Sequence, residues 1–513
     1  MTRNGVPPTP KPLVQLLLIG RGRSLFQIEP RAVLTAAALF AVFSMLLGFV
    51  QFGTPSLADN DGFYHLRMAA LMREFGLRVP FSWLPQSILS PEAFYDHHLL
   101  YHAYLSLFAV GSDQAMLIAA KFASIFLPAA AFVAVWWLLR GQRVRWASIW
   151  ALGLLAVSEA FLYRMSMPRA QSASLLVLAL GLHWLLRRKY WPLIPLGFLY
   201  VWLYNAFPLL LVVGGVVAIA TFMTERRLEW RALVFPAIGL VLGLIINPYF
   251  PQNITFIINH LLPKLGESAV SVGNEWYPYD TWALIGNSGF ALAAFVLGAF
   301  ALGWRGQKID RAALAAFGLS LVFGFMLFKA RRFVEYFPPF ALIFAALAIN
   351  PLLDALTWAG RRLLPIGLVA ILSVPLIITL TQARTSMAAQ TKPAETYAAA
   401  SYWLAQYAPP GAKIFQTDWD DFPRLFFYNT TSVYTIGLDP TYMELYDADL
   451  YATWVKITQG KVKAASATIR SDFGGDYVLT DLKHTAFINQ AKNDPGLTEV
   501  FRDKFSLVYA VAP

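Results

Sequence analysis

The sequence predicts a multi-span α-helical membrane protein with a C-terminal α/β domain outside the membrane. Apolar residues make up 57% of the 513 residues and charged residues only 14%, which is far from the balance of a soluble globular protein. The apolar residues gather into runs long enough to cross a bilayer. After residue 383 the composition changes, and short β-like runs alternate with helical segments, as they do in α/β domains. The β-like runs are 412–417, 432–436, 477–480 and 505–511, and the helical segments are 394–408, 441–458 and 484–493.

The apolar runs predict about 11–13 transmembrane helices. The number is a range because hydropathy windows merge and split neighbouring spans. The shortest run, 191–204, is a candidate half of a bent hairpin. The chain therefore divides into a tail at 1–31, a transmembrane domain at 32–382 and an α/β domain at 383–513. The assigned spans are 32–52, 115–139, 145–163, 170–186, 191–204, 206–222, 233–249, 282–303, 311–328, 334–349 and 363–381.

Lysine and arginine fall mainly in alternate loops, on the same side as the N-terminal tail. Cytoplasmic loops carry such an excess, so we expect a cytoplasmic N-terminus. With an odd number of spans, the α/β domain is then periplasmic or extracellular, and the protein is integral to a plasma membrane such as the bacterial inner membrane. The basic loops are 140–145, 187–189, 226–231, 305–311 and 361–362.

Two further features of the composition narrow the class. Topology explains the net charge of +11, so the charge predicts no nucleic-acid partner. The chain has no cysteine, which excludes disulfides and zinc-thiolate sites. The first apolar segment lacks a small-residue cleavage site and is predicted to be a retained span.

The stretch Ala58 to Ala69 is acidic at its start and continues as a short amphipathic helix. Asp59 and Asp61 precede apolar residues at helical spacing, and Gly76 is a candidate end for the helix. Two compatible interpretations are open. In the first, one carboxylate caps the N-terminus of the helix. In the second, the carboxylates bind a metal ion or orient a nucleophile at the outer surface.

Four of the seven histidines lie between residues 65 and 102, inside the long first external loop 53–114. His98 and His102 are one helical turn apart and can share a face, with Asp96 nearby. Two interpretations of these residues are open, namely a metal site and a set of polar side chains at the membrane interface. The lack of a third ligand at fixed spacing favours the polar set.

Several basic residues lie on the external side, against the bias of the other loops. They are Arg164, Arg169, Lys329, Arg331 and Arg332. One interpretation is that their side chains extend to lipid headgroups. The other is a site for a lipid-linked phosphate or pyrophosphate, because the planar fork of arginine suits that geometry.

Architecture and motifs together resemble the glycosyltransferase-C superfamily of polyprenyl-lipid-dependent enzymes, above all the catalytic subunit of oligosaccharyltransferase and its single-subunit bacterial form. Asn60-Asp61-Gly62-Phe63 resembles that family's first acidic motif, which implies that Asp61 binds a metal and the acceptor. Ser271-Val272-Gly273-Asn274-Glu275, in the external loop 250–281, resembles its Ser-Val-x-Glu motif, which implies that Glu275 points to the acceptor.

Two later segments extend the resemblance. Arg332-Phe333 with Tyr336 is similar to the family's Arg-Phe-x-x-Tyr segment, whose arginine meets the lipid pyrophosphate. Asp418-Trp419-Asp420-Asp421-Phe422 falls where the family carries Trp-Trp-Asp-Tyr-Gly, which implies acceptor binding by Trp419, Asp420 and Asp421. The chain departs from the family at residues 163–171, which hold no carboxylate where a second acidic motif is expected.

The resemblance implies transfer of a sugar or oligosaccharide from a polyprenyl phosphate or pyrophosphate to a glycan, lipid or protein acceptor at the outer face. Asp61, Asp59 and Glu275 are the catalytic candidates, with Asp61 as general base or metal ligand. The implied cofactor is a divalent metal, Mg²⁺ or Mn²⁺, or none, since arginines alone can stabilise the leaving phosphate. No Gly-rich phosphate loop predicts a nucleotide cofactor. The candidates for donor-phosphate binding are Arg332, Arg331, Arg164, Arg169, His97 and His98.

Two alternatives remain open. A transferase that uses a polyprenyl-phosphate monosaccharide and acts on a lipid or polysaccharide is favoured by the missing second acidic motif. A transporter or flippase of lipid-linked glycans predicts charges at the bilayer midplane and paired repeats. The spans are nearly free of charge, which favours an enzyme.

Overall fold

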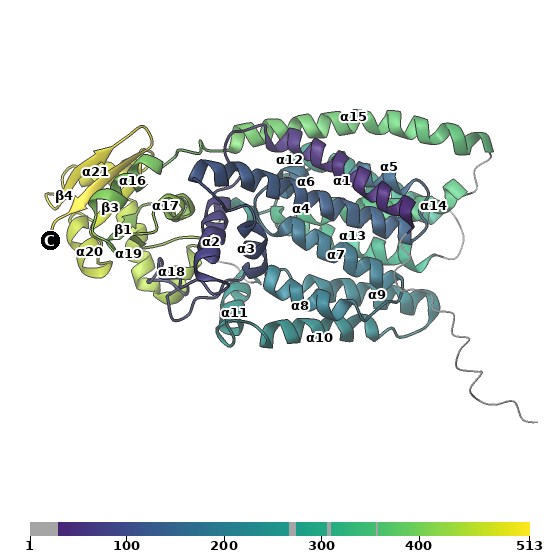
Figure 1. Cartoon of the computed structure of the whole chain (residues 1–513), viewed down its shortest axis with the longest axis horizontal. Coiled ribbons are helices and arrows are strands. Elements are labelled where there is room, and N and C mark those ends of the chain that lie inside the picture. Colours follow the sequence, from purple (N-terminus) through teal and green to yellow (C-terminus); the bar gives the residue numbers. More distant parts are fainter. Residues whose placement is uncertain (1–28, 266–272, 305–308, 355–357) are drawn as a thin grey trace, which may run out of the picture.

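The computed structural model describes residues 29–265, 273–304, 309–354 and 358–513. Long helices run side by side in a bundle, and a small sheet domain lies beyond one end of it, which we call the domain end (Figure 1). Several predicted features lie outside the described residues. They are most of the tail 1–31, the Ser271-Val272 half of one motif, and Arg305 and Lys308 of one basic loop.

Each assigned span coincides with an apolar helix or a bent pair of helices, which confirms the multi-span class. By length and composition, the helices able to cross a membrane are Pro30–Gln51 (α1), Asp113–Gly141 (α4), Thr281–Trp304 (α12), Arg311–Lys329 (α13) and the Leu363–Gln390 part of Trp358–Gln390 (α15). A further candidate is formed by Ala147–Leu152 (α5) with Gly153–Leu155 (η2), bent by 85° from Glu159–Met165 (α6). The shorter apolar helices are Gln171–Leu186 (α7), Leu193–Leu203 (α8), Leu209–Glu225 (α9), Arg231–Ile245 (α10) and Phe337–Asp354 (α14).

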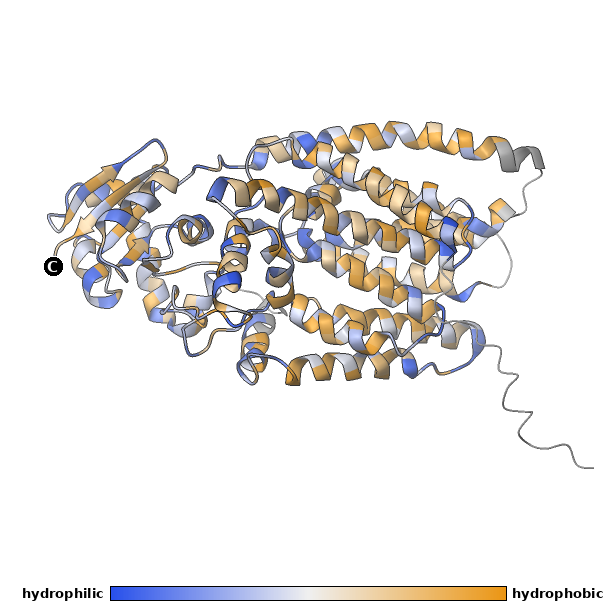
Figure 2. Cartoon of the chain, viewed as in Figure 1, coloured by the Kyte–Doolittle hydropathy of each residue, from blue (hydrophilic) through white to orange (hydrophobic). Residues whose placement is uncertain are grey.

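The outer surface of the bundle is apolar, as contact with lipid requires. Figure 2 shows hydrophobic residues along the bundle helices and hydrophilic residues gathered in the sheet domain and the connecting loops. On the outer helices α12 and α15, Trp304 is 82% exposed and Ile371 71%. Exposed apolar surface of this extent marks a membrane-facing region. Helix α15 continues to Gln390, past residue 383, where the sequence predicts that the α/β domain begins.

Short helices cover the domain end. They are Asp61–Phe75 (α2), Leu99–Ser106 (α3), Gln252–Leu265 (α11), Asn274–Trp276 (η3) and Arg331–Glu335 (η4). The helix expected after the acidic pair is confirmed, and it ends at Gly76, whose φ of 82° is accessible to glycine. Segment 250–281, which the sequence predicts to be a loop, is partly helical through α11 and η3.

The C-terminal domain is a mixed α/β unit, as predicted. Its described sheet has the order β2-β1-β3-β5-β4, with β1 parallel to β2 and β3, and β5 antiparallel to β3 and β4. The strands are Lys413–Gln416 (β1), Val433–Tyr434 (β2), Tyr477–Asp481 (β3), Leu497–Arg502 (β4) and Ser506–Val511 (β5). The helices are Ala398–Tyr407 (α16), Trp419–Asp421 (η5), Phe422–Tyr428 (α17), Thr441–Tyr446 (α18), Ala448–Thr458 (α19), Ala465–Asp472 (α20) and Thr485–Ala491 (α21). The sequence did not predict β4, whose residues are mostly half-buried or exposed at the sheet edge.

Helix α2 joins the bundle to this domain by packing against α17. The rings of Phe63 and Phe427 meet edge to face with centroids 5.4 Å apart. Arg67 Nε donates a 2.6 Å hydrogen bond to the Phe427 carbonyl, and Trp83 Nε1 donates one of 2.8 Å to the Thr430 carbonyl. Segment 53–114 is therefore part of the interface between the two parts, and it brings the acidic pair to their junction.

Candidate active site

The acidic motif is anchored to the α/β domain by its asparagine. Asn60 Nδ2 donates a 2.6 Å hydrogen bond to Asp420 Oδ2, and Asn60 Oδ1 accepts one of 2.8 Å from Arg424 Nε. Asn60 is also the residue before α2, and no side chain caps that helix. The capping interpretation of Asp59 and Asp61 is therefore wrong, and both carboxylates point elsewhere.

Both carboxylates of the acidic motif pair with Arg169. Its Nε lies 3.0 Å from Asp59 Oδ2, and its Nη2 is in direct contact with Asp61 Oδ2. The loop between α6 and α7 supplies this arginine and lies directly on the start of α2. A Cβ atom on Gly62 would come within 2.1 Å of Pro168 Cγ, so only glycine permits this approach.

Three arginines converge on the carboxylate of Glu275. Arg164 Nη1 lies 3.0 Å and Arg169 Nη1 3.3 Å from Glu275 Oε2, while Arg332 Nη1 lies 3.2 Å from Oε1. Burial acts to raise the pKa of Glu275, but the three guanidinium groups together hold that pKa well below its usual value. The cluster therefore favours the ionised form of Glu275, whose side chain is 27% exposed.

Three residues that the motif analysis did not select complete this arginine cluster. Buried Glu335 accepts a 2.8 Å hydrogen bond from Arg164 Nε. Arg332 Nη2 donates a 3.0 Å bond to Tyr204 Oη, and the Arg332 guanidinium lies 4.3 Å from the centre of the Trp276 ring. A carboxylate within an apolar span was the sequence signal for Glu335, whereas Tyr204 carried none.

Asp59 titrates near neutrality. Burial raises its pKa, Arg169 lowers it and the neighbouring charge of Asp61 raises it again, to about 7. Asp420 behaves similarly, because burial and the charges of Asp61 and Asp418 outweigh Lys392 and raise its pKa to about 6. The site thus holds two carboxyl groups whose charge changes in the physiological range.

Some predicted residues are not part of this cluster. Arg331 Nε donates a 3.0 Å hydrogen bond to the Pro278 carbonyl, and its guanidinium lies over the Tyr279 ring. Asp421 is 1% exposed, and Trp419 packs against the core of the α/β domain. Of the acceptor-binding candidates, Asp420 is the one that contacts the acidic motif.

Four histidines form a network at α2, in which His65 and His102 are buried and His97 and His98 are half-buried. His102 Nδ1 lies 2.7 Å from Asp96 Oδ2, and His102 Nε2 lies 2.8 Å from His65 Nδ1. Burial holds the pKa values of His65 and His98 well below the usual value, so both rings are neutral. His98 packs against His65, with ring centres 4.7 Å apart. His97 stacks on Phe256, with ring centres 5.0 Å apart. The His98–His102 face predicted from helical spacing is used for internal contacts.

The residues at the acidic motif do not fit a divalent metal held by protein carboxylates. Asp59 Oδ2 and Asp61 Oδ2 already face the guanidinium group of Arg169. Within the described ranges, no three His, Cys, Asp or Glu side chains are grouped so that they could hold a metal ion. The loop that would supply a further carboxylate supplies Arg164 and Arg169 instead.

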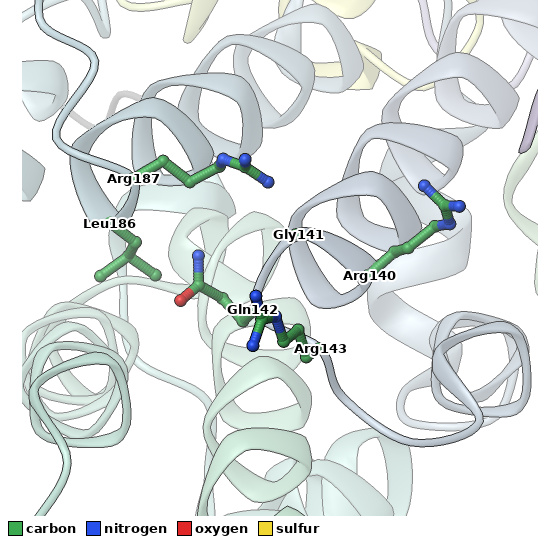
Figure 3. Close-up of a pocket in the computed structure, with 6 residues that line it drawn as sticks. All are labelled: Arg140, Gly141, Gln142, Arg143, Leu186 and Arg187. Carbon is green, nitrogen blue, oxygen red and sulfur yellow. The ribbon is translucent and has the colours of Figure 1, made fainter. Parts of the chain in front are cut away.

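A polar pocket lies at the other end of the bundle. Figure 3 shows the arginines that line it, which come from the C-terminal ends of α4 and α7. The opposite ends of these helices carry Asp113 and Gln171, on the domain end. This pocket is thus remote from Asp61 and Glu275. It is lined by Arg140, Gly141, Gln142, Arg143, Leu186 and Arg187.

No protein-family model and no curated protein sequence matches the chain, but solved structures do. The oligosaccharyltransferase AglB from Archaeoglobus fulgidus, in complex with an inhibitory peptide and a dolichol-phosphate, is 13% identical with a TM-score of 0.63, over 93% of this chain and 74% of that one. ArnT from Cupriavidus metallidurans, bound to undecaprenyl phosphate, is 15% identical with a TM-score of 0.58, over 92% and 97%. The arabinofuranosyltransferase AftD from Mycobacteria is 17% identical with a TM-score of 0.54, over 93% of this chain but 40% of its own. The chain therefore has the fold of the glycosyltransferase-C superfamily of membrane proteins.

Proposed function

We propose that this protein is a membrane glycosyltransferase that takes a sugar from a polyprenyl phosphate or pyrophosphate donor. One observation carries the proposal, namely the convergence of Arg164, Arg169 and Arg332 on the single carboxylate of Glu275. Guanidinium groups bind phosphate with the same paired N–H···O geometry that they use for carboxylate. A donor phosphate that displaces Glu275 would meet the same three guanidinium groups.

The acidic motif and the arginine cluster each contribute to the proposed reaction. The acceptor, an O–H or N–H group, attacks the anomeric carbon of the sugar, and the bond from that carbon to the phosphate oxygen breaks. The acceptor proton passes to the carboxylate of Asp61 as general base. The electron pair of the broken bond leaves on the phosphate, whose charge Arg332 and Arg164 stabilise.

The likeness to solved structures supports the choice of donor. AglB was solved with a dolichol-phosphate and ArnT with undecaprenyl phosphate, and both ligands are polyprenyl phosphates. The charge bias of the loops supports a site at the outer face, with a cytoplasmic N-terminus and an external α/β domain. The acceptor is a glycan, a lipid or a protein.

The transferred group is either an oligosaccharide or a monosaccharide. The Asn-Asp-Gly motif and the AglB likeness favour an oligosaccharide on a pyrophosphate. The lack of a carboxylate at residues 163–171 favours a monosaccharide on a monophosphate, and the chain covers 97% of ArnT. Competition between undecaprenyl phosphate and undecaprenyl pyrophosphate for the purified protein separates these candidates, because the tighter ligand identifies the donor class.

Binding of undecaprenyl phosphate, measured by native mass spectrometry, tests the proposal. Arg332→Ala should weaken binding about tenfold to a hundredfold, because a hydrogen bond to a charged group is worth about 1.5–3 kcal/mol. Arg332→Lys should recover little of it, since an ammonium lacks the planar fork. The matched control is Arg331→Ala, which removes the adjacent arginine that bonds to Pro278 and should leave binding unchanged.

Two results would contradict the proposal. Equal binding by wild type and Arg332→Ala would leave the arginines as lipid-headgroup contacts. Movement of a lipid-linked glycan across a vesicle membrane, without transfer to any acceptor, would instead identify a flippase.

A further inference from the structure

Arg169 is surrounded by carboxylates on every edge of its guanidinium group. Nε faces Asp59, Nη2 faces Asp61 and Nη1 faces Glu275. These three acids come from the loop before α2, from α2 itself and from η3. The side chains of Arg169 and Asp61 are each 21% exposed, so the contacts are partly shielded from bulk water. A single cation thus gathers acids from three separate segments.

The chain holds Arg169 in place by contacts on both sides of its loop. Tyr163 Oη donates a 3.0 Å hydrogen bond to the Ala58 carbonyl. Gln171 Nε2 donates one of 2.6 Å to the Arg164 carbonyl, which closes the loop. On the other side Gly62 allows Pro168 to lie against α2. These backbone contacts position Arg169 independently of its ion pairs.

A divalent metal would need the same oxygen atoms. Mg²⁺ and similar hard cations take oxygen ligands at about 2.0–2.6 Å, and the guanidinium of Arg169 already occupies the space that Asp59 and Asp61 face.

We infer that Arg169 is a built-in cation that takes the place of a divalent metal at the acidic pair. This inference rests on the proposed transferase function and adds that the reaction is independent of divalent metal. Arg169 is a positioning residue, which fixes the orientation of the Asp61 carboxylate and places one positive charge beside the arginine cluster. Arg164 and Arg332 make no contact with the acidic pair, and they meet the donor phosphate when it displaces Glu275.

Mn²⁺ binding, followed by electron paramagnetic resonance on the purified full-length protein, tests the inference. Wild type should leave the spectrum of free Mn²⁺ unchanged. Arg169→Asp removes the cation and supplies a third carboxylate beside Asp59 and Asp61, so bound Mn²⁺ should appear. Adding Asp61→Asn to that variant should abolish the signal. A purely structural role for Arg169 predicts no gain of Mn²⁺ binding.

The inference is overturned if wild type binds Mn²⁺ and loses it on Asp61→Asn. That measurement stands even if Arg169→Asp does not fold. In a transfer assay, wild-type rates should be equal in EDTA and in Mn²⁺, and a metal requirement would also overturn the inference. Binding of undecaprenyl phosphate is measured separately. If wild type binds neither this lipid nor Mn²⁺, the proposed function is contradicted, whereas the absence of metal at the acidic pair is not.

Discussion

Asn60 and Asp420 are joined by a 2.6 Å hydrogen bond across 360 residues of chain. The same asparagine accepts a bond from Arg424, and the Arg424 guanidinium lies 4.1 Å from the centre of the Phe63 ring. The start of α2, which carries the acidic pair, is therefore fixed to the α/β domain. Any motion of that domain relative to the bundle would move Asp61.

Asn60→Ala should loosen this junction. It leaves the buried guanidinium of Arg424 without one partner, at a cost of about 1.5–3 kcal/mol for a charge-assisted bond. The melting temperature should fall, and proteolysis between α15 and the α/β domain should accelerate. The control is Asn493→Ala, which removes an exposed bond to the Asn489 carbonyl. Equal stability of the two variants would contradict the anchoring role.

Asp61→Asn should lower the transfer rate by about 10²-fold or more, the scale for loss of a general base. The side chain keeps its size, so the folded protein should be recovered. The initial rate with saturating donor is the measurement. Glu499→Gln removes an exposed carboxylate that pairs with Arg502 at 2.7 Å on strand β4, and should leave the rate unchanged. A larger effect of Asp59→Asn would assign the base to Asp59.

Asp59→Asn should change how stability depends on pH. Because the pKa of Asp59 is raised from 3.8 to about 7, the folded state holds a proton that the unfolded chain has released. Wild-type stability should therefore fall as pH rises from about 4 to about 7, and should level off above that. The amide removes this contribution, so the variant should gain in melting temperature relative to wild type over that window. A difference that does not vary with pH would be evidence against the raised pKa.

Gly62→Ala should separate Asp61 from Arg169. The added Cβ would meet Pro168 Cγ at 2.1 Å, so α2 and the loop must move apart, at a typical overpacking cost of about 1–3 kcal/mol. Transfer should fall about tenfold or more, since the general base is displaced. Gly286→Ala is the control, because a Cβ there has no neighbour within 4 Å. Unchanged transfer by the Gly62 variant would show that the close approach is dispensable.

The orientation in the membrane is also testable. The bias of the basic loops predicts that the C-terminus is external. Alkaline phosphatase fused after Pro513, which is active only outside the cytoplasm, should be active. Green fluorescent protein fused at the same position should be non-fluorescent, because it is exported unfolded. The reverse pair of results would invert the topology and place the site at the cytoplasmic face.

The local sequence was enough to predict the helical spans, the short helix after Asp61 and most strands of the α/β domain. These depend on the hydropathy and spacing of neighbouring residues, which the chain displays directly. Helix α11 and strand β4 were missed. The first lies in a segment read as a loop between prolines, and the second is a half-exposed edge strand with a weak apolar pattern.

The sequence also identified the chemically unusual residues, because acids and arginines stand out at the ends of apolar spans. Their partners were decided only by the tertiary structure. Arg169 meets Asp61 across 108 residues, and Arg332 meets Glu275 across 57. No local pattern encodes which of several arginines faces which carboxylate, because that depends on how the helices pack and on close approaches such as that of Gly62 to Pro168. The same packing assigned Arg331 to the Pro278 carbonyl and its neighbour Arg332 to the site.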